Sequence, residues 1–204
     1  SALDFDGSTT DATRYIHVTA AAGHSFVDHA SKLTNPLTYN VSNGVGITGA
    51  NGYSSAEIIV TDNYVKLSRL QMRSTSATGG VLRAIGTNIR IDQCIIKNAT
   101  TAANNTRANV YATAAGNNGV VVNTLMETAG AYAVALAQTD GWEFHNVTMV
   151  ATGGSSTGAL FLSYISGALP LLKNCAVFGF TEVVKASVSN CDIHASSNYN
   201  STDE

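Results

Sequence analysis

One short pattern recurs along the chain and limits what it can fold into. The pattern reads apolar-x-apolar-x-polar-apolar-x-apolar, and neighbouring copies start 16 to 31 residues apart. The copies begin at Val65, Ile89, Val120, Trp142, Pro170 and Ala186. The copies at Val120 and Pro170 are looser, and Glu127 breaks the last apolar position of the former. Since alternate residues of a strand point to opposite faces, each copy predicts two short strands around a polar corner, with the apolar residues inside the bend.

Most copies are preceded by a further short apolar stretch, such as 57–60 before Val65 or 133–136 before Trp142. A coil of three short strands cannot bury its inner face alone, so it has to stack on similar coils. The sequence therefore predicts an all-β solenoid of about six to seven coils over residues 57–196, built from parallel sheets.

Stacking the copies gives columns of equivalent residues. The corner column is expected to contain Arg69, Gln93, Thr124, Asn146, Asn174 and Asn190. Asparagine suits this position because it tolerates left-handed backbone and its amide can bond to the next coil. The neighbouring inward column is expected to contain Leu70, Cys94, Leu125, Val147, Cys175 and Cys191. The three cysteines are therefore interpreted as small buried hydrophobes, and Trp142 is expected to face the core.

Composition excludes several classes of protein. Only 12% of the residues are charged and the net charge is −3, which gives no basic surface for nucleic acid. No apolar run is long enough to span a membrane, and the first residues lack the pattern of a signal peptide. The three cysteines follow no metal-binding spacing, so neither a zinc site nor a disulfide framework is expected. No metal or other cofactor is predicted.

The recurring pattern resembles the right-handed parallel β-helix of the pectate-lyase-like superfamily, over about residues 57–196. The superfamily includes polysaccharide lyases and hydrolases, adhesins, and the tailspike and decoration proteins of tailed phages. Three N-terminal stretches, 13–20, 22–28 and 37–45, are similar to phage and prophage virion proteins. The resemblance implies a right-handed coil and a location at the virion surface.

The ends of the chain do not follow the coil pattern. Residues 1–56 are expected to form an N-terminal cap, with a strand at 15–20 and a short helix over 25–32. Ser25 and Asp28 are spaced as a capping pair for that helix. Residues 197–204 are expected to form a polar, featureless tail, so a partner or further chain would have to cover the last coil.

Candidate chemistry is expected on two outward columns. The first contains Lys66, Arg90, Val121, Glu143, Leu171 and Ser187, and the second contains Ser68, Asp92, Asn123, His145, Lys173 and Ser189. Arg90, Asp92, Glu143, His145 and Lys173 would then share one outer face, where Asp92 and Glu143 could act as an acid and base pair. The alternative is alternating charge on a solvated sheet. The carboxylate clusters of lyases and the paired motifs of hydrolases are absent from the sequence, which favours the alternative.

Two classes of function therefore stay open. The first is a non-enzymatic structural protein of a phage virion, a capsid-decoration or tail-associated β-helix. Its partners would be other virion proteins, with a homotrimer and a host-surface glycan as further candidates. The second is a polysaccharide lyase or hydrolase, or a carbohydrate-binding adhesin that lacks chemistry.

Overall fold

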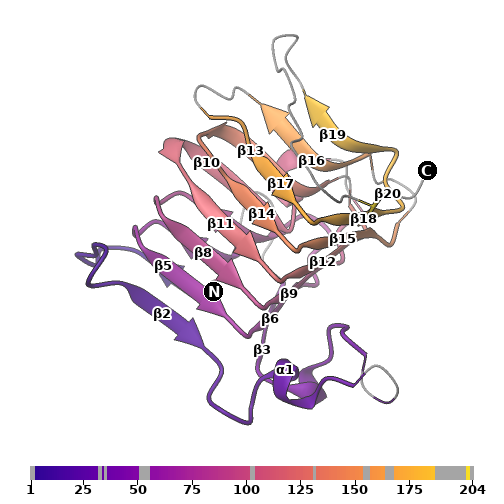
Figure 1. Ribbon diagram of the computed structural model, residues 1–204, viewed down its shortest axis with the longest axis horizontal. Coiled ribbons are helices and arrows are strands. Elements are labelled where there is room, and N and C mark those ends of the chain that lie inside the picture. Colours follow the sequence, from indigo (N-terminus) through magenta and orange to yellow (C-terminus); the bar gives the residue numbers. More distant parts are fainter. Residues whose placement is uncertain are drawn as a thin grey trace.

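The computed structural model describes residues 3–31, 34, 36–50, 56–101, 104–130, 132–153, 157–163, 168–186 and 201–202 of the 204. Within these residues the chain forms three parallel sheets that wind into a right-handed β-helix (Figure 1). Two of the described sheets have seven strands and one has six. The predicted fold class is confirmed.

Each turn of the chain adds one strand to each sheet. The first sheet contains β1 (Leu3–Phe5), β4 (Ala56–Val60), β7 (Gly80–Ala84), β10 (Val110–Asn117), β13 (Tyr132–Thr139), β16 (Gly158–Ser163) and β19 (Glu182–Ala186). The second contains β2 (Ile16–Thr19), β5 (Val65–Ser68), β8 (Ile89–Asp92), β11 (Gly119–Val122), β14 (Glu143–His145) and β17 (Leu171–Lys173). The third contains β3 (Gly46–Gly49), β6 (Gln71–Ser74), β9 (Ile95–Asn98), β12 (Leu125–Thr128), β15 (Thr148–Ala151), β18 (Ala176–Phe178) and β20 (Ser201–Thr202).

The core is a single column of apolar side chains enclosed by the three sheets. In the coil formed by β4, β5 and β6, the inward residues Ile58, Leu67 and Met72 are completely buried. Equivalent inward residues of the following coils join them in one continuous cluster. This is what strand alternation predicts when only one face of each strand meets the interior.

The corners between the second and third sheets use left-handed backbone. The corner residues have φ between 49° and 58°, and they are Arg69, Gln93, Asn123, Asn146 and Asn174. Their N–H groups continue the ladder between coils, as when Gln93 donates to the carbonyl of Val122 at 3.0 Å. The side-chain amide of Asn146 also donates to Asn123 Oδ1 at 3.1 Å. An amide contact between coils was predicted for the asparagines of this corner, and Asn146 makes one, with Asn123 as its partner where Thr124 was expected.

The third copy of the pattern, which lies in the fourth coil, is out of register by one residue with the prediction. Val121 pairs with Ile91 and Leu125 with Ile95. The left-handed corner residue is therefore Asn123, and Thr124 takes the inward position that was expected for Leu125. Thr124 is 2% exposed, whereas Leu125 lies half-buried on the outer side.

The correct columns follow from this register. The inward column is Leu70, Cys94, Thr124, Val147 and Cys175, all of them buried. On the outer face of the second sheet, Val120 and Val122 stand where Val121 and Asn123 were expected. Because this strand has three consecutive valines, the sequence does not show which of them face the core. The sixth copy contributes only Ala186 to the described residues, so Cys191, Asn190, Ser187 and Ser189 lie outside them.

Gly119 and Trp142 settle the register of the fourth coil. Trp142 lies level with Gly119 in the neighbouring strand, because Glu143 pairs with Val120. Trp142 is completely buried, as predicted, and its Nε1 donates to Asn117 Oδ1 at 2.7 Å. A Cβ atom on Gly119 would approach Trp142 Cη2 to 2.7 Å and the carbonyl oxygen of Ile89 to 2.8 Å. A glycine is needed at this inward position to make room for the indole ring.

The N-terminal segment contains a coil of its own, which corrects the expectation that residues 1–56 lack the coil pattern. Strands β1, β2 and β3 pair in parallel with β4, β5 and β6. Sequence reasoning missed the coil because 26 residues separate β2 from β3, so the pattern is interrupted at its corner. The strand expected at 15–20 is confirmed as β2. A covering role for residues 1–56 stays a prediction.

The insertion between β2 and β3 carries the predicted helix. Helix α1 (Phe26–His29) is shorter than expected, and Ser25 and Asp28 form the predicted capping box. The 3-10 turn η1 (Val41–Asn43) follows, and a second 3-10 turn, η2 (Asn105–Arg107), lies between β9 and β10. The insertion packs beside the coils: Asp28 forms an ion pair with Arg69, and the Gln71 side chain bonds to the backbone of Asn40. Hydrogen bonds from the Ser25 backbone and the charge of Arg69 lower the pKa of Asp28.

Two residues near the C-terminus belong to the third sheet. Strand β20 pairs with β18 through Ser201 and Thr202. Both residues lie within the predicted polar tail, residues 197–204.

Candidate functional site

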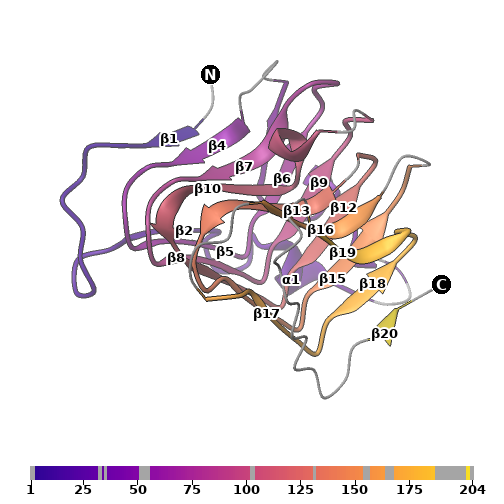
Figure 2. The ribbon, with the colours of Figure 1, turned by 90° about the horizontal axis from the view of Figure 1, so that it is seen from above.

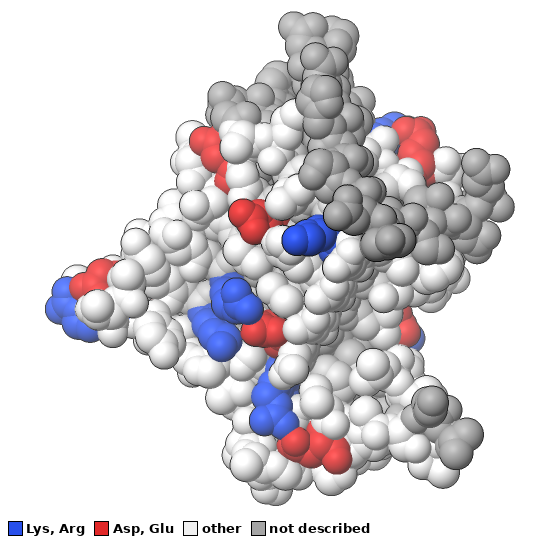
Figure 3. All heavy atoms as spheres, viewed as in Figure 1, with Lys and Arg blue, Asp and Glu red and all other residues white. Residues whose placement is uncertain are grey.

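The five residues singled out as candidate chemistry all lie on the outer face of the second sheet. Arg90 and Asp92 come from β8, Glu143 and His145 from β14, and Lys173 from β17. They point outward because each alternates with a buried residue, such as Ile91 on β8 or Phe144 on β14. Figure 3 views this face and shows basic and acidic side chains next to one another on a largely uncharged surface. The structure thus brings the predicted residues to one face.

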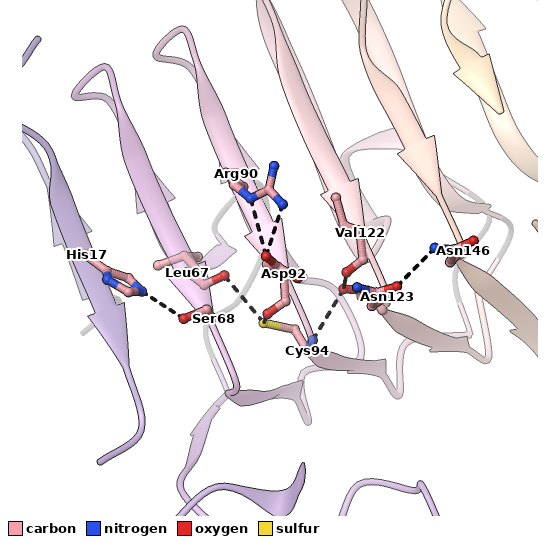
Figure 4. Close-up of polar contacts among 10 residues, drawn as sticks. His17, Leu67, Ser68, Arg90, Asp92, Cys94, Val122, Asn123 and Asn146 are labelled. Atoms are coloured by element: carbon pink, nitrogen blue, oxygen red, sulfur yellow. Dashed lines mark hydrogen bonds and ion pairs between the residues drawn. The ribbon is translucent and has the colours of Figure 1, made fainter. Parts of the chain in front are cut away.

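The two carboxylates on this face are each paired within their own strand. Arg90 donates to Asp92 Oδ2 through Nε at 3.3 Å and through a terminal nitrogen at 3.1 Å (Figure 4). Glu143 Oε2 lies 2.8 Å from His145 Nε2. The side chains of Arg90 and Glu143 are 44% and 47% exposed, so water screens both pairs.

Strand β11 separates the two pairs with valines. Val120 lies between Arg90 and Glu143, and Val122 lies between Asp92 and His145. Two strand spacings and two residues of offset put the Cα atoms of Asp92 and Glu143 about 12 Å apart. Carboxyl groups that act together on a glycosidic bond lie roughly 5 to 9.5 Å apart. As they stand, both carboxylates face their own partners, and an uncharged rung lies between them.

The histidine on β2 belongs to the same face. His17 Nε2 lies 2.8 Å from Ser68 Oγ (Figure 4). Burial, together with the nearby charge of Lys66, lowers the pKa of His17. The imidazole is therefore neutral near pH 7 and forms an ordinary hydrogen bond between coils.

An open groove runs along the corner between the second and third sheets, and sequence reasoning missed it. It has a volume of about 360 Å³. Its lining is uncharged and consists of Leu37, Asn123, Thr124, Leu125, Asn146 and Thr148. The asparagines of the corner were the signal in the sequence that could have indicated the groove. The register error assigned Asn123 to the outer face of the second sheet instead, and Leu37 lies far away in the sequence, in the insertion between β2 and β3. Amides, hydroxyls and aliphatic groups suit an uncharged polar ligand.

The described cysteines support the core and are not placed for chemistry. Cys94 Sγ donates to the carbonyl oxygens of Leu67 and Asp92 at 3.6 and 3.4 Å (Figure 4). Burial raises the pKa of Cys94 to about 12 and also raises the pKa of Cys175. In the equivalent position of the fourth coil, Thr124 Oγ1 donates to the carbonyl of Val122 at 2.8 Å. In these three coils a small side chain that donates to a backbone carbonyl therefore occupies the inward position beside the corner.

Two further features bear on the classes of function. Across the described residues, no group of three or more His, Cys, Asp or Glu side chains is arranged to hold a metal ion. The helices in the described part of the chain are too short to cross a membrane.

Comparison with known proteins adds no assignment. No family model matches the chain, and neither the curated proteins nor the solved structures contain a significant match.

Proposed function

We propose that this protein is a non-enzymatic structural module of a phage virion, a capsid-decoration or tail-associated β-helix that forms a rigid part of the particle surface. The observation that carries the proposal is the unbroken stacking of the three sheets around one apolar core. In the described part of the chain the first six coils are hydrogen-bonded to one another in all three sheets, so bending the rod would strain many bonds at once. A stiff rod of this kind suits a structural part of a particle that is exposed to solvent and proteases.

The state of the outer charges also supports a structural role. Asp92 and Glu143 are engaged by Arg90 and His145 respectively, and each pair lies within its own strand. A catalytic acid and base would need to converge on one bond of a substrate. Paired charges on a sheet face instead keep the surface soluble and add modestly to stability. The resemblance of the N-terminal stretches to virion proteins, taken from the sequence alone, is the reason for proposing a phage particle.

The proposal is tested on particles released from induced cultures of the source organism. Antibody raised against the purified chain should label the surface of these particles in immunogold electron microscopy. Added Asp92→Ala or Glu143→Ala protein should bind particles that lack the chain as well as the unchanged protein does. A Leu67→Glu variant, which places a carboxylate in the core, is the matched loss-of-fold control. Particles without label would overturn the virion assignment.

A polysaccharide lyase or hydrolase is the second candidate, because Arg90, Asp92, Glu143, His145 and Lys173 do share one face. Incubation with capsular polysaccharides should then release reducing ends or unsaturated uronates. Asp92→Asn and Glu143→Gln should abolish the release, while Asp11→Asn, at an exposed acid of the loop between β1 and β2, should not. Glycan binding without cleavage would instead indicate an adhesin, for which the uncharged groove beside Asn123 and Asn146 is the suitable surface.

A further inference from the structure

The outer face of the first sheet differs in character from that of the second. One outward residue from each strand forms a straight column, since the strand register is continuous from β1 to β19 (Figure 2). In order, the column reads Asp4, Ile59, Arg83, Tyr111, Ala135, Phe161 and Lys185. Apolar and aromatic residues occupy most of the column, and a charge stands at each end.

The aromatic part of this face is only partly covered. The rings of Tyr132 and Phe161 are in contact, with centroids 4.7 Å apart. Tyr111 and Phe161 are half-buried, and Ala135 between them is fully buried. Aromatic side chains that remain partly accessible on a surface are enriched at protein interfaces.

Arg83, on the same face, has a hydrogen-bond donor without an acceptor in the described part of the chain. Its Nε is buried and has no hydrogen-bond partner among the described residues. A buried donor without an acceptor is costly, so a partner group on this face would be stabilising. Tyrosine offers both a hydroxyl acceptor and a ring face for a guanidinium group.

The order of the column fits a reversed copy of itself. A two-fold axis in the plane of the interface, parallel to the strands and through Tyr111, reverses the order of the rungs. Asp4 then faces Lys185 of the second copy, and Ile59 faces Phe161. Arg83 faces the small Ala135, one rung from the second copy's Tyr111, whose hydroxyl and ring are within reach of the long guanidinium side chain. A two-fold axis along the solenoid would instead place Asp4 over Asp4 and Arg83 over Arg83, which is unfavourable.

We infer that the outer face of the first sheet is an isologous dimer interface, in which two copies of this chain pack with their solenoid axes antiparallel. Two-fold dimers of this type are the commonest homo-oligomers, and they need a self-complementary patch. Lys185 also lies 3.7 Å from Glu182 Oε1, but both side chains are well exposed and such pairs are weak. The lysine can therefore change partners when the second copy arrives. The inference does not depend on the proposed function.

Sedimentation velocity over a micromolar concentration series measures the association. The unchanged chain should sediment as a monomer–dimer equilibrium. Phe161→Glu should weaken the dimer roughly 100-fold, because an unpaired carboxylate would be buried against Ile59. Val120→Glu, at a half-buried outward site of the second sheet, is the matched control and should leave it unchanged. Circular dichroism checks that both variants fold. A strictly monomeric or trimeric unchanged chain would overturn the inference.

A charge exchange tests the antiparallel arrangement directly. Asp4→Lys alone and Lys185→Asp alone should each weaken the dimer about threefold to tenfold, and the double exchange should restore it. Cysteine pairing gives a second readout, in a Cys191→Ser background. A mixture of Asp4→Cys and Lys185→Cys chains should form the mixed disulfide. Cross-linking of Asp4→Cys chains with one another would show parallel axes and contradict the inference.

Discussion

At the scale of single residues, the corner between the second and third sheets is the most demanding position in the fold. It requires left-handed backbone, which costs roughly 1 to 2 kcal/mol for a residue with a Cβ atom. Asparagine meets the requirement at three of the five described corners, and at one of them its amide also joins two coils. Arg69 and Gln93 adopt the same conformation with less suitable side chains, and Arg69 is held there by Asp28 as well.

Replacement of Asn146 separates these two contributions. Asn146→Ala should lower the free energy of unfolding by about 1 to 2 kcal/mol, since it loses the amide bond to Asn123 and strains the corner at φ 54°. Asn146→Gly loses the amide bond but accepts the backbone conformation, so it should cost less than alanine. Urea denaturation of the two variants checks the order. An alanine variant as stable as the unchanged chain would show that the corner is not strained.

At the scale of strands, the fit between Gly119 of β11 and Trp142 at the start of β14 fixes how the fourth coil sits on the fifth. The large residue and the missing side chain lie level with each other on adjacent strands. Asn117 completes the arrangement, because it accepts from the indole N–H and donates to the carbonyl of Gly86. One large residue thus ties three successive coils together.

Gly119→Ala should therefore destabilise the fold although alanine has the higher strand propensity. The added methyl would lie 2.7 Å from Trp142 Cη2 and 2.8 Å from the carbonyl oxygen of Ile89. Overpacking of this kind costs about 1 to 3 kcal/mol. Trp142→Phe in the same chain should recover part of the loss, as measured by thermal and urea unfolding of the single and double variants. Strictly additive effects of the two substitutions would contradict the proposed contact.

At the scale of the whole molecule, the apolar residues of the first coil are less buried than those of the coil that follows it. The inward residue Leu3 of the first coil is 39% exposed, whereas its neighbour Ile58 in the next coil is fully buried. Phe5, Ile16, Val18 and Ile47 of the first coil are likewise only partly buried. A solenoid gains stability from contacts between neighbouring coils, and the first coil has a described neighbour on one side only.

Hydrogen exchange should therefore follow a gradient along the rod. Amides of β2 and β3 are expected to exchange through local opening, well before those of β8 and β9, which have strands on both sides. Mass spectrometry of peptic fragments measures this difference. Equal protection in the first and third coils would mean that the first coil is covered, as an N-terminal cap would require.

The sequence predicted a coil correctly where its apolar and polar residues alternate strictly, because the alternation then shows which residues face inward. Strict alternation in Ile89–Ile96 placed Arg90 and Asp92 outward and Cys94 inward without ambiguity. The consecutive valines at 120–122 fit two arrangements, with either Val121 or its two neighbours facing inward. The sequence analysis used the wrong one, so Asn123, Thr124 and Leu125 were each assigned to the wrong column. The first coil was not recognised in the sequence because the long insertion between β2 and β3 interrupts the pattern at the corner. Its strand Ile16–Thr19 was nevertheless predicted.

By itself the sequence determined the repeating unit, because alternation and polar corners are local properties that each coil carries in its own residues. It also determined the capping of α1, which depends only on Ser25 and Asp28. Only the tertiary structure decided the register of the fourth coil, the groove beside Leu37 and the separation of Asp92 from Glu143. These depend on which residues of different coils lie side by side, and neighbours across a stack are set by packing between distant parts of the chain.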